Sequence, residues 1–216
     1  MVNKKYAHLA LVVDRSGSMG TIKDDMNKGL AEFLKTTEAN FKGKILVDVV
    51  TFDTIVERPF KDTPIAEVKG EFVHPRGGTA LNDALGTTIV ALGEKFASLP
   101  EKERPGRVLV MVVTDGEENS SREYKTDQIK KLVTEQTSKY DWNFLFLGAN
   151  IDSFAVGGGY GIKGGSTLNY VATAAGVNNM TRSAVAYASA YFGGDSQVTV
   201  ADAQEDTIKV KITTKK

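Results

Sequence analysis

The sequence of 216 residues contains no cysteine, which excludes disulfide bonds, thiolate nucleophiles and zinc sites built on cysteine. Lysine plus arginine and aspartate plus glutamate both number 27, so no excess charge would attract nucleic acid or anionic lipid. No hydrophobic run is long enough to cross a membrane. The apolar stretch near the N-terminus is also too short for a secretory signal, so we expect a cytoplasmic protein.

What remains is an ordinary globular composition, with 41% hydrophobic and 25% charged residues. A chain of this length can bury a core of useful size. It accommodates one large domain, or one domain with an extension.

Hydrophobic patterning alternates between strand-like and helix-like segments. Continuous apolar runs are typical of buried strands of a parallel sheet, and apolar residues at helical spacing are typical of amphipathic helices. We expect strands over residues 6–13, 44–52, 54–60, 107–113, 142–147 and 168–171, and helices over residues 19–40, 81–99, 121–140, 151–156 and 176–192. A tight turn at Asp53 predicts that the second and third strands form an antiparallel hairpin.

This alternation predicts an α/β fold of Rossmann-like type, with a mostly parallel central sheet, one antiparallel edge strand and helices on both faces. The end of the chain differs, because short β-like runs at residues 197–200 and 207–213 flank a polar turn. We therefore expect a main domain over residues 1–193 and a C-terminal β-hairpin extension over residues 194–216.

Oxygen-bearing side chains follow two of the expected parallel strands. Asp14, Ser16 and Ser18 follow the first strand at alternate positions, and Asp115 follows the strand over 107–113. Ligands of open parallel sheets bind beyond the carboxyl ends of the strands, so we expect Asp14 and Asp115 to be neighbours. Oxygen-only ligands suit Mg²⁺, Mn²⁺ or Ca²⁺.

Three motifs in order resemble those of the von Willebrand factor type A domain with its metal-ion-dependent adhesion site. They are Asp14-x-Ser16-x-Ser18, Gly77-Gly78-Thr79 and Thr114-Asp115-Gly116. The resemblance covers roughly residues 5–192. It implies a metal site made by Asp14, Ser16, Ser18, Thr79 and Asp115, with the serines binding directly, Thr79 directly or through water, and the aspartates mainly through water.

The resemblance further implies a protein-binding module and no enzyme. Mg²⁺ is the expected cation, with Mn²⁺ or Ca²⁺ as alternatives, and a partner's Asp or Glu would fill its open position. Domains of this type in bacteria and phages often act beside AAA+ ATPases or in stress-response and tellurite-resistance-like systems. We expect no nucleic-acid or membrane partner, and the oligomeric state stays open.

Other interpretations of these residues are weaker. A metal-dependent phosphoester hydrolase would need a general acid or base, and Ser16 stands where a second Asp would be required. Gly159-x-Gly161-x-x-Gly164 spells a dinucleotide fingerprint, but it does not join a strand directly to a helix. A structural role through the C-terminal strands is a third alternative. Glu117, Glu118 and Asp83 are expected to be solvated or to favour a helix N-terminus.

Overall fold

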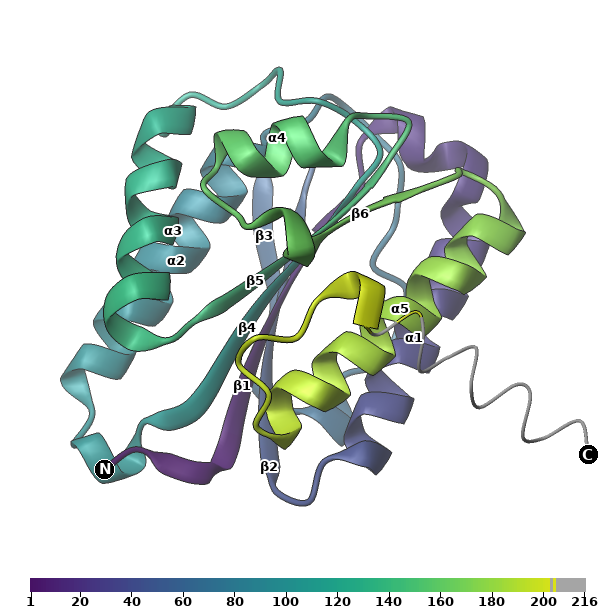
Figure 1. Cartoon of the computed structure of the whole chain (residues 1–216). Coiled ribbons are helices and arrows are strands. Elements are labelled where there is room, and N and C mark those ends of the chain that lie inside the picture. The colour runs from purple at the N-terminus through teal and green to yellow at the C-terminus, as the bar shows by residue number, and fades with distance from the viewer. Residues whose placement is uncertain (203, 205–216) are drawn as a thin grey trace, which may run out of the picture.

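The computed structural model describes residues 1–202 and 204. Its central sheet has six strands in the order β3-β2-β1-β4-β5-β6, and only β3 runs antiparallel to its neighbour (Figure 1). The strands are β1 (Asn3–Asp14), β2 (Lys44–Phe52), β3 (Val56–Pro64), β4 (Pro105–Thr114), β5 (Asn143–Ala149) and β6 (Thr167–Tyr170). This confirms the predicted fold class of the main domain.

Helices cover both faces of the sheet. The α-helices are α1 (Lys23–Asn40), α2 (Leu81–Ser98), α3 (Thr126–Tyr140), α4 (Ser153–Gly159) and α5 (Ala174–Gly193). Four short 3₁₀ helices span Gly17–Ile22, Ile65–Glu67, Glu101–Glu103 and Gly164–Ser166. In Figure 1, α1 and α5 lie together on one side of the sheet, and α2 and α3 lie on the other.

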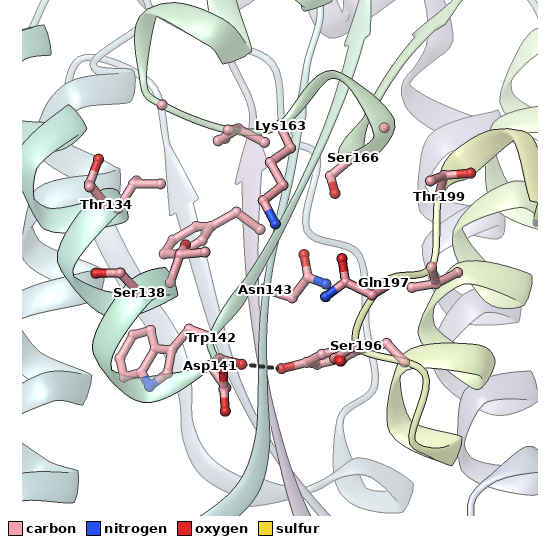
Figure 2. Close-up of a pocket in the computed structure, with 18 residues that line it drawn as sticks. Thr134, Ser138, Asp141, Trp142, Asn143, Lys163, Ser166, Ser196, Gln197 and Thr199 are labelled. Carbon is pink, nitrogen blue, oxygen red and sulfur yellow. Dashed lines mark hydrogen bonds between the residues drawn. The ribbon is translucent and has the colours of Figure 1, made fainter.

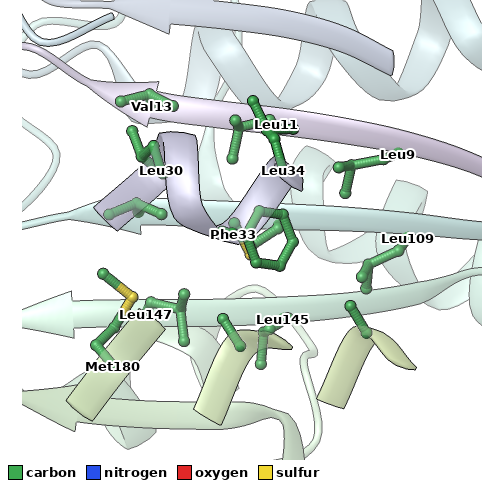
Figure 3. Packing of buried hydrophobic residues seen from close by; sticks show 14 of the residues in the cluster. Leu9, Leu11, Val13, Leu30, Phe33, Leu34, Leu109, Leu145, Leu147 and Met180 are labelled. Atoms are coloured by element: carbon green, nitrogen blue, oxygen red, sulfur yellow. The ribbon is translucent and has the colours of Figure 1, made fainter. Parts of the chain in front are cut away.

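Two hydrophobic clusters result from the alternation of side chains along the strands. Leu9, Leu11 and Val13 of β1 face α1 and α5, where they pack with Phe33 and Met180 (Figure 3). The intervening residues of β1 pack instead against α2 and α3. Burial of the central strands on both faces explains their nearly unbroken apolar sequences.

Two predicted helices begin several residues later than expected, and the helix expected over residues 151–156 spans Ser153–Gly159 instead. Residues 19–22 belong to a 3₁₀ helix, and α1 begins only at Lys23. Residues 121–125 are not helical, and α3 begins at Thr126. Backbone N–H groups of this segment bind the Asp83 carboxylate, which competes with helix formation.

The prediction of a strand over residues 197–200 is wrong. Residues 198 and 199 have no regular structure, and a helical segment begins at Val200. Val198 and Val200 are buried in the cluster that contains α5, so their alternation reflects packing of an irregular segment. The second expected strand, over residues 207–213, lies outside the described residues, and the boundary after residue 193 stays a prediction.

Among the helices of the described part of the chain, none combines the length and the apolar composition needed to cross a bilayer.

Candidate metal site at the carboxyl edge of the sheet

Two adjacent parallel strands bring the predicted aspartates together. Asp14 is the last residue of β1, and Asp115 directly follows β4, which pairs with β1 through Val13 and Val113. The Thr114 hydroxyl donates a hydrogen bond of 2.6 Å to Asp14 Oδ2. Asp14 is fully buried and Asp115 is 7% exposed.

The two serines join these aspartates through a chain of hydrogen bonds. Ser16 N–H donates to Asp14 Oδ1 over 2.6 Å, and Ser16 Oγ lies 3.1 Å from Ser18 Oγ. Ser18 Oγ donates to Asp115 Oδ1 over 2.6 Å, so the proton between the serines comes from Ser16. Because each hydroxyl proton is directed toward a neighbouring oxygen, lone pairs of both serine oxygens are left for a cation.

Thr79 reaches the same place from the loop before α2. Gly77 has a φ of +64°, which favours glycine, and its carbonyl accepts a 3.2 Å hydrogen bond from Gly17 N–H. A Cβ on Gly116 would lie 3.3 Å from Thr79 Oγ1 and 3.8 Å from Ser18 Oγ. Both hydroxyls therefore border the same glycine, and the structure brings all five predicted residues together.

The two carboxylates lack a cationic partner within the part of the chain that the structure describes. Burial raises the pKa of Asp14, hydrogen bonds from Thr114 and Ser16 oppose this shift, and the Asp115 charge adds to it. Burial likewise raises the pKa of Asp115, against the opposing hydrogen bond from Ser18. The apolar surroundings and mutual repulsion thus disfavour two negative charges here unless a positive charge is added.

A tyrosine that the motifs do not include completes the surroundings. Tyr170, at the end of β6, is 7% exposed, and its hydroxyl is buried without a hydrogen-bond partner. Burial raises its pKa, and the charges of Asp115 and Asp14 raise it further, so this O–H is near both carboxylates. Uncompensated carboxylates, neutral hydroxyls and an orphaned phenol form a set of groups that fits a hydrated hard cation such as Mg²⁺. Ser18 is exposed, so the set opens to solvent.

The loop after Asp115 is fixed to the loop of Thr79. Asn119 Oδ1 accepts from Thr79 N–H over 2.8 Å, and the Thr79 carbonyl accepts from Asn119 N–H and Ser120 N–H. Glu118 accepts from Asn82 N–H at the start of α2 over 2.7 Å. Asn119 carries no signal in the sequence, and Glu118 was expected only to be solvated or to favour a helix N-terminus.

A cluster of ion pairs next to the serine loop was also missed. Asp53 Oδ2 lies 2.8 Å from Arg15 Nε and 2.7 Å from Arg76 Nε, and Glu57 Oε2 lies 2.5 Å from an Arg15 nitrogen. Although burial opposes it, the hydrogen bond from Arg76 lowers the pKa of Asp53, and the hydrogen bond from Arg15 lowers that of Glu57. Arg15 is therefore engaged away from Asp14, its neighbour in sequence.

A cavity of about 450 Å³ lies elsewhere, between α3, β5 and the segment after α5. Figure 2 shows the Lys163 side chain extending into it, together with Asn143, Ser166 and Gln197. None of the five predicted metal ligands lines this cavity. The candidate metal site therefore lies outside this cavity, at the carboxyl edge of the sheet.

No protein-family model matches the sequence, and no curated protein matches it. Solved structures do match. Proximal thread matrix protein 1 from the mussel byssus is 16% identical with a TM-score of 0.60, covering 86% of this chain and 46% of that one. The ArnB paralog VWA2 from Sulfolobus acidocaldarius is 14% identical with a TM-score of 0.56, covering 83% and 44%. The vWF domain of the type V pili tip protein Mfa5 from Porphyromonas gingivalis is 10% identical with a TM-score of 0.53, covering 81% and 93%.

The chain therefore has the fold of von Willebrand factor type A domains. It spans about half the length of the first of these solved chains. At such low identity the comparison shows the fold, and the function must be argued from the site.

Proposed function

We propose that this chain is a protein-binding module that holds a divalent cation. Mg²⁺ is the expected ion, and its ligands would be Ser16, Ser18, Thr79, Asp14 and Asp115. When bound, the cation would supply the positive charge that attracts a carboxylate of a protein partner. The observation that carries the proposal is the hydrogen-bonded chain from Asp14 through both serines to Asp115, beside the Thr79 hydroxyl.

The chemistry of the residues favours capture of a ligand. Three of the five side chains are neutral hydroxyls, so the set carries at most two negative charges against the two positive charges of the cation. A cation held in this way retains affinity for an additional anionic ligand. The exposure of Ser18 leaves a side from which a partner's Asp or Glu can approach.

The residues do not favour catalysis. His8 lies in the middle of β1, about 20 Å along the strand from Asp14 at 3.3 Å per residue. The His74 ring contacts the Glu71 carbonyl over 3.1 Å in the loop before Gly77. We therefore propose binding without turnover, in the cytoplasm, next to an AAA+ ATPase or a stress-response system.

Calorimetric titration of the full chain with Mg²⁺ tests the cation site. We expect one ion per chain for the wild type, and no binding for Asp14→Ala. Asp127→Asn is the matched control, because it removes an exposed carboxylate from the first turn of α3 and should bind normally. Unchanged Mg²⁺ binding by Asp14→Ala would contradict the proposal.

A pull-down from the native host tests partner capture. The wild type is compared in Mg²⁺ and in EDTA, alongside Ser18→Ala and Asp127→Asn in Mg²⁺. We expect a protein retained by the wild type and the control that is lost with EDTA and with Ser18→Ala. Retention in EDTA would show that recognition does not use the cation.

A further inference from the structure

A second group of metal-ligating side chains lies in the middle of the sheet, on the face covered by α2. His8 of β1, Asp48 of β2 and Asp62 of β3 each place one ligand atom within 4.8 Å of the others. His8 Nε2 lies 3.6 Å from Asp48 Oδ1. This group is separate from the Asp14 site, because five residues of β1 lie between His8 and Asp14.

Two of these side chains are buried with unsatisfied polar atoms. His8 is fully buried and Asp48 is 1% exposed, yet His8 Nε2 and Asp48 Oδ2 have no hydrogen-bond partner. Neighbouring positions on the same face are apolar, and the Phe96 ring lies 5.1 Å from the His8 ring. Buried polar atoms of this kind are costly and uncommon unless a water or an ion satisfies them.

The backbone of β3 directs the third carboxylate toward the other two. Pairing between β2 and β3 shifts register around Asp48, and Asp62 has a left-handed φ of 51°. Asp62 N–H donates to Asp48 Oδ1 over 2.6 Å. Irregularities within strands re-aim side chains and are common near functional sites.

The second ring nitrogen of His8 is held by the Tyr6 hydroxyl, which can orient the imidazole as a metal ligand. Tyr6 Oη lies 3.2 Å from His8 Nδ1, and burial raises the pKa of Tyr6 to about 12. In the tautomer with a proton on Nδ1, this nitrogen donates to the tyrosine oxygen and the Nε2 lone pair faces Asp48. Histidine ligands of metals are usually oriented by such a hydrogen bond at the other ring nitrogen.

Two cations neutralise the carboxylates in this structure. Lys95 of α2 forms an ion pair with Asp62, and an Arg58 nitrogen lies 3.7 Å from Asp48 Oδ2. Burial lowers the pKa of Lys95. The negative charge of Asp48 opposes this shift, and the positive charges of Lys61, Lys44 and Arg58 add to it. Because Lys95 and Asp62 are both partly exposed, the lysine can turn toward solvent and leave the carboxylate to another cation.

We propose that His8, Asp48 and Asp62 form a site for a transition-metal ion such as Zn²⁺, and that Lys95 occupies it as an exchangeable cation in the metal-free chain. An imidazole with two carboxylates suits Zn²⁺ better than Mg²⁺. The ion would reach the site from solvent past Asp62 and Lys95, whose side chains are 34% and 24% exposed.

Titration of the full chain with Co²⁺, followed by visible absorption, tests the site, because Co²⁺ reports histidine ligation in place of Zn²⁺. The background is Asp14→Ala/Asp115→Ala, so failure of the first site cannot affect the result. We expect one equivalent of Co²⁺ with a visible spectrum that one equivalent of Zn²⁺ displaces. Asp62→Asn should lose the spectrum, and His74→Asn, which removes the only other histidine, should keep it.

Lys95→Met gives a sharper test, because it removes the competing cation and should tighten binding. An unchanged Co²⁺ affinity in Lys95→Met would show that Lys95 does not compete with the metal for Asp62.

No Co²⁺ spectrum in either the background chain or its Lys95→Met version would overturn the proposal. The same holds for a spectrum that survives Asp62→Asn. Far-UV circular dichroism of each variant confirms that the sheet is intact. Asp62 and Lys95 are partly exposed, so the test does not depend on replacing the fully buried His8.

Discussion

Asp14 and Asp48 are both almost completely buried, on neighbouring strands, yet the fold treats them differently. Asp48 lies in mid-strand, where the chain supplies Arg58 and Lys95 as nearby cations. Asp14 lies at the strand end, where it receives only hydrogen bonds from neutral donors and faces a second carboxylate. In the metal-free chain, side-chain cations therefore lie near the mid-sheet carboxylate, whereas the described residues place none next to the carboxylates at the edge.

The largest expected effect on the free energy of unfolding comes from removing the Asp48 carboxylate. Asp48→Ala leaves Arg58 and Lys95 without that carboxylate and Asp62 N–H without its acceptor. We expect a loss of about 3 kcal/mol in the free energy of unfolding, as for other buried charges deprived of a partner. Urea denaturation measures it. A loss no larger than that of Asp14→Ala in EDTA would remove the distinction between the two aspartates.

Binding of Mg²⁺ at the Asp14 site should raise the free energy of unfolding by an amount close to the loss expected for Asp48→Ala. At a Mg²⁺ concentration about 100 times its dissociation constant, binding should contribute about 2.7 kcal/mol. Thermal unfolding in Mg²⁺ and in EDTA measures this difference. Asp14→Ala should unfold at the same temperature in both solutions, and a Mg²⁺ shift that survives this substitution would place the ion elsewhere.

In EDTA, Asp14→Asn should raise the free energy of unfolding slightly at pH 7, because it removes a buried charge that faces Asp115. The folded-state pKa of Asp14 is raised, so the folded chain binds more protons than the unfolded chain between the two pKa values. Stability therefore rises as pH falls through the folded pKa, and the advantage of Asp14→Asn should shrink toward pH 4.

Urea denaturation of the wild type and Asp14→Asn at pH 7 and pH 4 measures this change. Asp53 and Glu57 have lowered pKa values, so their contribution is lost as pH falls, but equally in both proteins. An advantage of Asp14→Asn that grew on acidification would contradict the assigned direction.

The smallest expected effect concerns the fit around Gly116. In Gly116→Ala the new Cβ would lie 3.3 Å from Thr79 Oγ1, so the threonine must move by a few tenths of an ångström. We expect Mg²⁺ affinity to fall by about fivefold, which is roughly 1 kcal/mol, while stability in EDTA changes little. Calorimetry measures it, with Gly158→Ala as a control, since no heavy atom lies within 4 Å of the corresponding Cβ.

The sequence predicted the strands of the sheet and the positions of Asp14, Ser16, Ser18 and Asp115 because these depend on local signals, whereas Thr79 was expected only from the resemblance of its motif. Apolar runs mark buried strands, and polar residues that follow them directly must lie at the carboxyl edge. Asn119 and Tyr170 gave no such signal, since their roles depend on which loops and strands meet in space. Asp62 was missed because it lies beyond the strand expected over residues 54–60, and because only the irregular pairing of β3 brings it next to Asp48.

Glu118 and Asn119 join the loop after β4 to the beginning of α2, while Gly17 and Gly77 join the loop after β1 to the same region. A pull exerted on a ligand held at this edge would therefore not act on one loop alone. The tension would be shared among two central strands and a long helix, each anchored in the core along its length.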